Sequence, residues 1–150
     1  MISKEIGKYF ERIINLEESI DLKGIKNIFD SGTAILLWIG TNNWEKEDFV
    51  NAIKNMLEKE VIAICVSGKR VKEQFDLLID TQSLLSTVKH TMTYMFDDKD
   101  IESVLENLFW GVITDDERWE NWKNYLLTVI GDPNAASDVK KLIKEKWNDQ

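Results

Sequence analysis

Residues 33–39 read TAILLWI, an unbroken apolar run that is followed by the turn-forming Gly40-Thr41-Asn42-Asn43. A strand with one face in water alternates polar and apolar residues, whereas a strand buried on both faces of a parallel sheet is apolar throughout. The run is also short, which favours a strand over a buried helix. We therefore predict a buried parallel strand at residues 33–39.

The same pattern recurs three times further along the chain. Extended segments at residues 61–66, 88–96 and 125–130 each precede a turn and then a segment with apolar residues at helical spacing. Four strand–turn–helix units in series imply a parallel sheet with helices on both faces, joined by right-handed crossovers. We predict a small doubly wound α/β fold with a four-stranded, mostly parallel sheet in the order 2-1-3-4.

The third of these strands is more polar than the others. Lys89, Thr91 and Thr93 do not suit a strand that is buried on both faces. A position at the sheet edge, or one face in solvent, accounts for them.

The first thirty residues precede the four units. Their apolar residues recur at helical spacing: Ile6, Tyr9, Phe10, Ile13 and Ile14. This spacing predicts an amphipathic helix. We expect a single α/β domain over residues 1–150, with residues 1–30 as a helical extension and residues 31–150 as the four units.

The chain carries a net charge of −8, and most of it lies in residues 97–122. That segment holds nine acidic residues against only Lys99 and Arg118, a net charge of −7. Nucleic acids and anionic membranes need clustered cations, so neither is expected as the main partner. A basic protein fits better, because opposite charges speed association.

The location of the protein is expected to be cytoplasmic. A single cysteine excludes an internal disulfide and suits the cytosol. Met1–Phe10 alternates charged and apolar residues and lacks the apolar core of a secretory signal. The longest apolar runs are far too short to cross a bilayer.

Residues 65–70, Cys-Val-Ser-Gly-Lys-Arg, combine a thiol, a small turn and two cations. A P-loop requires a glycine where Ala63 stands and a serine or threonine where Arg70 stands. A cysteine-phosphatase loop places its arginine six positions after the thiol, and Arg70 comes after five. We predict a buried, inert Cys65 and no catalytic residue. Lys69 and Arg70 oppose the dipole of the following helix, so we expect them to face the acidic Asp97-Asp98 turn.

The strand-end turns suggest a small-ligand site. Ligands of doubly wound sheets bind beyond the carboxyl ends of the strands, where the strand order reverses. In the order 2-1-3-4 that point pairs residues 41–43 with Asp97 and Asp98. A nucleotide or phosphate site, with hydrolysis left open, would use six residues: Thr41, Asn43, Ser67, Lys69, Arg70 and Asp97.

Turns of this composition also serve as helix N-caps, and both interpretations stay open. The expected caps are Asn43 and either Asp97 or Asp98. We predict no metal and no cofactor, because His90 is the only histidine and the acidic turn lacks the spacing of a calcium loop.

The acidic segment also carries tryptophans, which are frequent at the energetic centres of protein interfaces. The segment predicts five contacts with a basic partner: Trp110, Asp115, Asp116, Glu117 and Trp119. The alternative is that the indoles pack inward and the acids are merely solvated.

Several short matches carry a resemblance to a known family. They are Trp38-Ile39-Gly40, Cys65-Val66-Ser67-Gly68, Asp76, Thr93-Tyr94 before Asp97-Asp98, Leu108-Phe109-Trp110 and Val129-Ile130-Gly131. On these points the chain resembles an uncharacterised family of small bacterial α/β proteins. The resemblance implies the α/β fold and carries over no activity and no catalytic residue. In composition the chain is similar to bacterial immunity proteins and antitoxins, which are small acidic domains that mask basic toxins.

Three hypotheses follow. The first is a non-catalytic binding module of immunity, antitoxin or inhibitor type that masks a basic protein. The second is the small-ligand domain at the strand ends. The third is an accessory domain whose N-terminal segment, Met1–Leu16, docks on an assembly or joins two copies as a homodimer.

Overall fold

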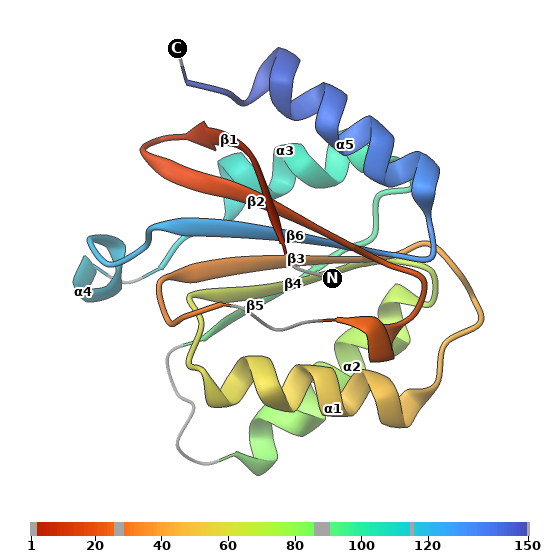
Figure 1. Ribbon diagram of the computed structural model, residues 1–150. Helices are drawn as coiled ribbons and strands as arrows, with labels where there is room; N and C mark the ends of the chain where they lie inside the picture. Colours follow the sequence, from red (N-terminus) through yellow and green to blue (C-terminus); the bar gives the residue numbers. More distant parts are fainter. Residues whose placement is uncertain (1–2, 26–28, 86–90, 115, 150) are drawn as a thin grey trace.

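The computed structural model describes residues 3–25, 29–85, 91–114 and 116–149. Its centre is a mixed six-stranded sheet (Figure 1). The strands are β1 (Lys4–Tyr9), β2 (Arg12–Ser19), β3 (Thr33–Ile39), β4 (Ala63–Gly68), β5 (Met92–Phe96) and β6 (Asn124–Ile130). Their spatial order is β1-β2-β6-β3-β4-β5, and every neighbouring pair is parallel except β1 with β2. The α/β class is confirmed, but the four-stranded sheet in the order 2-1-3-4 is wrong.

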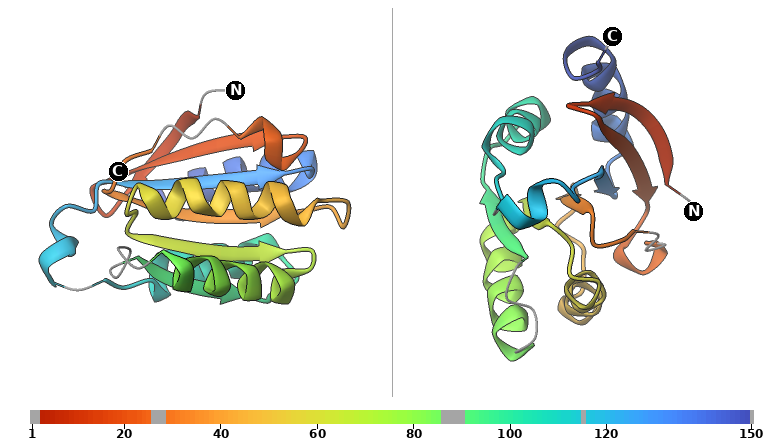
Figure 2. Two further views of the ribbon diagram at one scale, coloured as in Figure 1. Left: turned by 90° about the horizontal axis from the view of Figure 1, so that it is seen from below. Right: turned by 90° about the vertical axis from the view of Figure 1, so that its left-hand side faces the viewer.

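The helices cover both faces of this sheet, as the sequence predicts. They are η1 (Leu22–Gly24), α1 (Lys46–Glu58), α2 (Val71–Leu84), α3 (Ile101–Gly111), α4 (Asp116–Trp119) and α5 (Pro133–Lys146). Helices α1 and α2 lie on one face, and α3 and α5 lie on the other (Figures 1 and 2). Among the described helices, none has the length and apolar character needed to cross a membrane.

The predicted N-terminal helix is wrong, because these residues form the β1–β2 hairpin. The strands reverse at Phe10 and Glu11, whose φ angles are 56° and 62°. Two consecutive positive φ angles are typical of a tight hairpin turn, for which glycine and asparagine are the usual residues. Neither residue type is present, so the turn left no signal in the sequence. Because the turn was not recognised, the apolar residues of the hairpin, which lie three and four positions apart in the sequence, were interpreted as one face of a helix.

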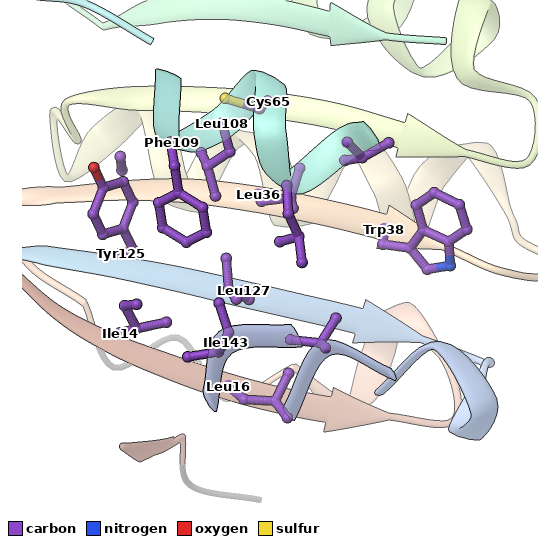
Figure 3. Close-up of a cluster of buried hydrophobic side chains, with 14 of the residues drawn as sticks. Ile14, Leu16, Leu36, Trp38, Cys65, Leu108, Phe109, Tyr125, Leu127 and Ile143 are labelled. Atoms are coloured by element: carbon purple, nitrogen blue, oxygen red, sulfur yellow. The ribbon is translucent and has the colours of Figure 1, made fainter. Parts of the chain in front are cut away.

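Strand β3 is the predicted buried strand, and all seven of its residues are buried between β6 and β4. Its side chains alternate between two cores. Leu36 packs with α3 and α5, whereas Ile35 and Leu37 pack with α1 and α2. Figure 3 shows Leu36 in the first of these cores, together with side chains from β2, β6 and the two covering helices. Burial of each such side chain contributes about 1.5–3 kcal/mol of stability.

The third predicted strand, β5, lies at the edge of the sheet. Two of its five residues are exposed and only Phe96 is fully buried. Of the two explanations offered for the polar residues of this strand, an edge position and a solvent-facing side, the structure shows the edge position. Lys89 and His90 lie outside the described residues.

The observed strand order changes which two neighbouring strands are followed by helices on opposite faces of the sheet. Strand β6 is inserted between β2 and β3, so β3 is followed by α1 on one face while its neighbour β6 is followed by α5 on the other. The reversal therefore brings Gly40 against Asp132, with no room for a side chain at residue 40. The predicted pairing of residues 41–43 with Asp97 and Asp98 is wrong.

Candidate functional site

The amino ends of the parallel strands carry two exposed tryptophans. Helix α3 runs back along the strands and ends near their starts, and α4 lies at the same end, just before β6 (Figure 1). Arg118 anchors α4 there by donating to the carbonyl oxygens of Ser31, 3.1 Å away, and Val61, 3.2 Å away, which precede β3 and β4. Trp110 is 65% exposed and Trp119 is 41% exposed. The two predicted partner tryptophans therefore lie at the same end of the sheet and face solvent.

A continuous row of aromatic rings joins these two indoles. We call it the aromatic array, and its rings follow in the order Trp110, Trp147, Phe109, Tyr125, Trp122 and Trp119. Successive ring centroids lie 6.2, 5.2, 4.9, 5.4 and 5.6 Å apart, in tilted or edge-to-face geometry. Such geometry is favourable between aromatic rings. Figure 3 shows the Phe109 ring beside the Tyr125 ring in the core. The four inner rings are buried and hold the two outer ones in place.

Arg12 strengthens one half of the aromatic array. Its guanidinium carbon lies 3.8 Å from the ring centroid of Trp122 and 4.8 Å from that of Trp119. The guanidinium donates to the Trp122 carbonyl and to the Tyr125 hydroxyl, both at 3.3 Å. The residue is only 6% exposed, and within the described parts of the chain no carboxylate pairs with it. Aromatic faces and two hydrogen bonds thus compensate the buried charge.

The same surroundings change the pKa of the Tyr125 hydroxyl. Burial raises the pKa of its hydroxyl, and the nearby Arg12 opposes that rise. Sequence reasoning missed Arg12 altogether. The available signal was its alternation with Ile14 and Leu16, which places the cation on the buried face of β2.

The acidic segment does not form one patch. Asp97, Asp98 and Asp100 lie at the carboxyl end of β5, away from the exposed tryptophans. Glu102 and Glu106 pair with Lys146 of α5, at 2.7 and 3.3 Å.

The remaining acids belong to the tryptophan end. Asp116 and Glu117 belong to α4, and Glu120 follows it. Asp115 lies outside the described residues.

The opposite end of the sheet contains the predicted ligand residues. A cavity of about 610 Å³ brings together Lys69, Arg70 and Asp97, three of the six predicted ligand residues, with Trp38 and Asp132.

The other three predicted ligand residues do not line this cavity. The Ser67 hydroxyl is buried and donates to the Leu37 carbonyl at 2.8 Å. The Thr41 hydroxyl accepts from the backbone N–H of Asn43 at 3.1 Å.

Arg70 has a structural role in this cavity. Its guanidinium donates to the Glu73 carboxylate at 3.0 and 2.8 Å and to the carbonyl oxygens of Asn42 and Trp44 at 3.1 and 2.9 Å. It also lies 3.8 Å from the Trp44 ring centroid. The hydrogen bond with Glu73 raises the pKa of Arg70. The expectation that Arg70 faces Asp97 and Asp98 is therefore wrong, because its acidic neighbour is Glu73.

The helix caps at this end also differ from the expected ones. Asp100, not Asp97 or Asp98, caps α3 by accepting from the Ser103 backbone N–H at 2.9 Å. The cap position of α1 is Glu45 rather than Asn43.

Asp132 at the carboxyl end has two partners. It caps α5 by accepting from the Ala135 backbone N–H at 3.1 Å. It also accepts from the Trp38 indole N–H at 3.0 Å. Each of its two carboxylate oxygens therefore already accepts one hydrogen bond within the fold.

Cys65 is fully buried in the sheet, and burial raises the pKa of its thiol well above its usual range. A buried neutral thiol is unreactive, which agrees with the predicted structural role. The described residues contain no group of three histidine, cysteine, aspartate or glutamate side chains suited to a metal ion.

The two ends of the sheet are thus chemically different. At the carboxyl end Arg70 and Asp132 bind neighbouring groups of the fold, whereas the amino end exposes large aromatic rings on a buried support. No family model matches this chain, and no curated protein or solved structure matches it either.

Proposed function

We propose that this chain is a non-catalytic protein-binding module of immunity, antitoxin or inhibitor type that masks a basic partner. The binding surface is the amino-end face, which we define as the surface carried by Phe10, Trp110, Ile113, Trp119 and α4. The observation that carries the proposal is the exposure of Trp110 and Trp119 at the two ends of one buried aromatic array.

Rigid aromatic side chains are effective anchors at interfaces. Association must offset the ordering of each mobile side chain, at about 0.5–1.5 kcal/mol. The aromatic array lowers this cost, because each exposed indole already packs against a buried ring. Phe10 and Ile113 are also more than half exposed at this end. Single exposed apolar residues need no explanation, but several at one end favour a binding surface.

We infer a basic partner from the negative charge of this chain. The sequence places four acids beside Trp119, namely Asp115, Asp116, Glu117 and Glu120, and the whole chain carries −8. A negative surface accelerates encounter with a positive partner and rejects acidic ones. The division of the acidic segment leaves fewer proposed contacts, and of these Asp116 and Glu117 belong to α4 and Glu120 follows it.

Affinity capture with the purified chain tests the proposal. The wild type and the Ile20→Ala control, which removes an exposed apolar side chain at the opposite end, should retain the same basic protein. The Trp110→Ala/Trp119→Ala variant should lose it, with an affinity at least about 100-fold weaker when the purified partner is titrated. A partner that binds the tryptophan variant as tightly as the wild type contradicts the proposal.

The acids have their own test. Changing Asp115 and Asp116 to Asn and Glu117 to Gln should slow association of that partner at low salt. The difference should shrink at high salt, because exposed charges are screened beyond roughly 8 Å at physiological ionic strength. Salt-insensitive binding, or full binding by the triple variant, would show that these acids do not contribute to the binding surface.

A second candidate function is a small-ligand site in the cavity at the carboxyl end. The observation that favours it is the meeting of Lys69, Arg70 and Asp97 around one space. A nucleotide or phosphate at 100 times its dissociation constant would stabilise the fold by about 2.7 kcal/mol. A rise in melting temperature with such anions that is lost in Lys69→Ala would support this candidate, and its absence at millimolar anion would reject it.

A further inference from the structure

The two edges of the sheet are built differently. The outer strand β1 carries Lys4, Glu5 and Lys8, and its register with β2 shifts between Glu5 and Gly7. Charges and irregular register are devices that prevent an edge from pairing with another strand. The opposite edge, β5, reads Met-Thr-Tyr-Met-Phe and has no charge. Within the described residues, these protective features are therefore found at the β1 edge and not at the β5 edge.

The backbone of β5 offers a row of hydrogen-bonding groups. The Met92 N–H donates toward β4, to the Ile62 carbonyl at 3.0 Å. Successive residues of a strand point to opposite sides, so Thr93 and Met95 direct their N–H and C=O groups outward. Within the part of the chain that the structure describes, β5 pairs only with β4. Such outward groups are a template for another strand.

Apolar side chains border this edge. Met92 and Met95 are 39% and 40% exposed. The Tyr94 hydroxyl contacts the backbone N–H and C=O of Ile113, both at 3.2 Å, which places the exposed Ile113 next to the strand. Figure 2, at the right, shows β5 at the outer margin of the molecule between α2 and α3.

Helix α2 completes the border on the other side. Gln82 donates to the Thr91 carbonyl at 3.0 Å, which holds the end of α2 against the start of β5. Ile79 lies three residues earlier and is therefore a neighbour of Gln82 on the helix surface. Its side chain is 40% exposed. The unprotected edge thus has an apolar border on both faces of the sheet.

We propose that a second copy of this chain binds to β5, so that two β5 strands pair antiparallel about a two-fold axis at Tyr94. In this register Thr93 faces Met95 of the other copy, and each such pair exchanges two backbone hydrogen bonds. The arrangement is self-complementary, as a two-fold interface must be. The sheet then continues from one copy into the other.

A second copy fits this edge better than an isolated peptide. A short extended peptide would satisfy the outward groups of β5 but leave Ile79 and Ile113 uncovered. A second copy brings its own α2 and its own segment after α3 against them. Stable dimers usually bury about 1,200–2,000 Å² in total, which the edge of a five-residue strand cannot supply alone. The inference does not rest on the proposed function, because it is argued from β5 and α2, and Ile113 is the one residue that both proposed surfaces use.

Light scattering after size exclusion tests the oligomeric state. Up to about 1 mM chain, the wild type should reach twice the 17.5 kDa of one chain. Met95→Lys should raise the dissociation constant of the dimer at least about tenfold, because it introduces a charge of the kind that protects edges. The control Ile20→Lys adds the same charge away from the edge and should dimerise like the wild type. A wild type that stays monomeric over this range overturns the proposal.

Cysteine cross-linking tests the register. In a Cys65→Ala background, Tyr94→Cys should form a disulfide-linked dimer, since residues facing each other in a non-hydrogen-bonded pair lie about 4.5 Å apart. Met92→Cys should not, because the two copies of that position lie roughly 13 Å apart along the strands. Each variant is first checked for cooperative thermal unfolding. Cross-linking at Met92 but not at Tyr94, or a dimer unaffected by Met95→Lys, overturns the two-fold β5 pairing.

Two further results separate this inference from the proposed function. Dimerisation should not weaken with salt, because β5 is uncharged, and it should persist in Trp110→Ala/Trp119→Ala. If the chain is monomeric but binds an extended peptide with the sequence of β5, the edge is a site for another protein's strand and the dimer is rejected.

Discussion

The two ends of the parallel strands use aromatic and charged residues in opposite ways. At the carboxyl end, Arg70 binds Glu73 and the loop before α1, and Asp132 binds Trp38 and the start of α5. At the amino end, the aromatic array is buried in the middle and exposed at both tips, Trp110 and Trp119. Arg70 and Asp132 at the carboxyl end therefore stabilise the fold, whereas Trp110 and Trp119 at the amino end are exposed to a partner.

This difference matters because sheets of this type usually bind ligands at the carboxyl end. In this chain the carboxyl end has a cavity, but Arg70 in its lining already donates hydrogen bonds to neighbouring backbone carbonyls and to Glu73. The fold alone therefore does not determine which end binds a partner; the chemistry of each end does.

Phe109→Ala should have the largest effect on stability. The Phe109 ring contacts the rings of Tyr9, Tyr125 and Trp147 at centroid distances of 5.3, 4.9 and 5.2 Å. Its loss should lower the free energy of unfolding by about 3–5 kcal/mol, measured by urea denaturation. Ile113→Ala, at an exposed position of the same end, should change it by less than about 0.5 kcal/mol. Similar losses of stability in the two variants would contradict the conclusion that buried rings support the exposed residues at this end.

Arg12→Lys should have a smaller but clear effect. Lysine keeps the charge but cannot stack a planar group on Trp122 or keep the fork of donors to the Trp122 carbonyl and the Tyr125 hydroxyl. We expect a loss of about 2 kcal/mol in the free energy of unfolding. A fully stable Arg12→Lys variant would show that charge alone suffices and that the stacking adds nothing.

Arg70 allows backbone and side-chain effects to be separated at the carboxyl end. Its φ of 59° is in the left-handed region, which glycine adopts without strain. Arg70→Gly and Arg70→Ala both remove the guanidinium, but the glycine variant should be more stable than the alanine variant by about 1 kcal/mol. Equal stabilities in thermal unfolding would mean that the turn relaxes, and that Arg70 is not held as described.

The smallest expected effect is a pH dependence at Asp100. Hydrogen bonds from the Ser103 backbone and hydroxyl lower the pKa of Asp100 below its ordinary 3.8. Stabilisation by a carboxylate with a lowered pKa is present above its unfolded-state pKa and is lost as pH falls through the folded-state pKa. The stability difference between the wild type and Asp100→Asn should therefore shrink as the pH drops below about 4. A difference independent of pH would contradict an ionised cap.

Local sequence patterns predicted the strands and helices that are apolar throughout or strongly periodic. The run at residues 33–39 matches β3, and the polar Thr93 indicated an edge strand. The β1–β2 hairpin was missed, because Phe10 and Glu11 occupy a turn that normally carries glycine or asparagine. The insertion of β6 between β2 and β3 is a long-range pairing, and no local pattern encodes it.

The sites were predictable to a similar extent. The sequence left open whether the tryptophans of the acidic segment are exposed or pack inward; Trp110 and Trp119 are exposed, whereas Trp122 is buried. What could not be predicted is that rings from α3, α4 and β6, with Trp122 before β6 and Trp147 after α5, build one aromatic array. Arg12 and Trp147 lie near opposite ends of the chain, and only the fold brings each of them against the array.

The most direct test of the central claim compares the two ends in one binding measurement. The purified basic partner is titrated by calorimetry into the wild type, into Trp110→Ala/Trp119→Ala, and into Lys69→Ala/Lys99→Ala, whose two lysines line the cavity at the carboxyl end. The account predicts a loss of at least about 100-fold in affinity for the tryptophan variant and less than about threefold for the lysine variant. The reverse order, with the lysine variant impaired and the tryptophan variant intact, would contradict the assignment of function to the amino end.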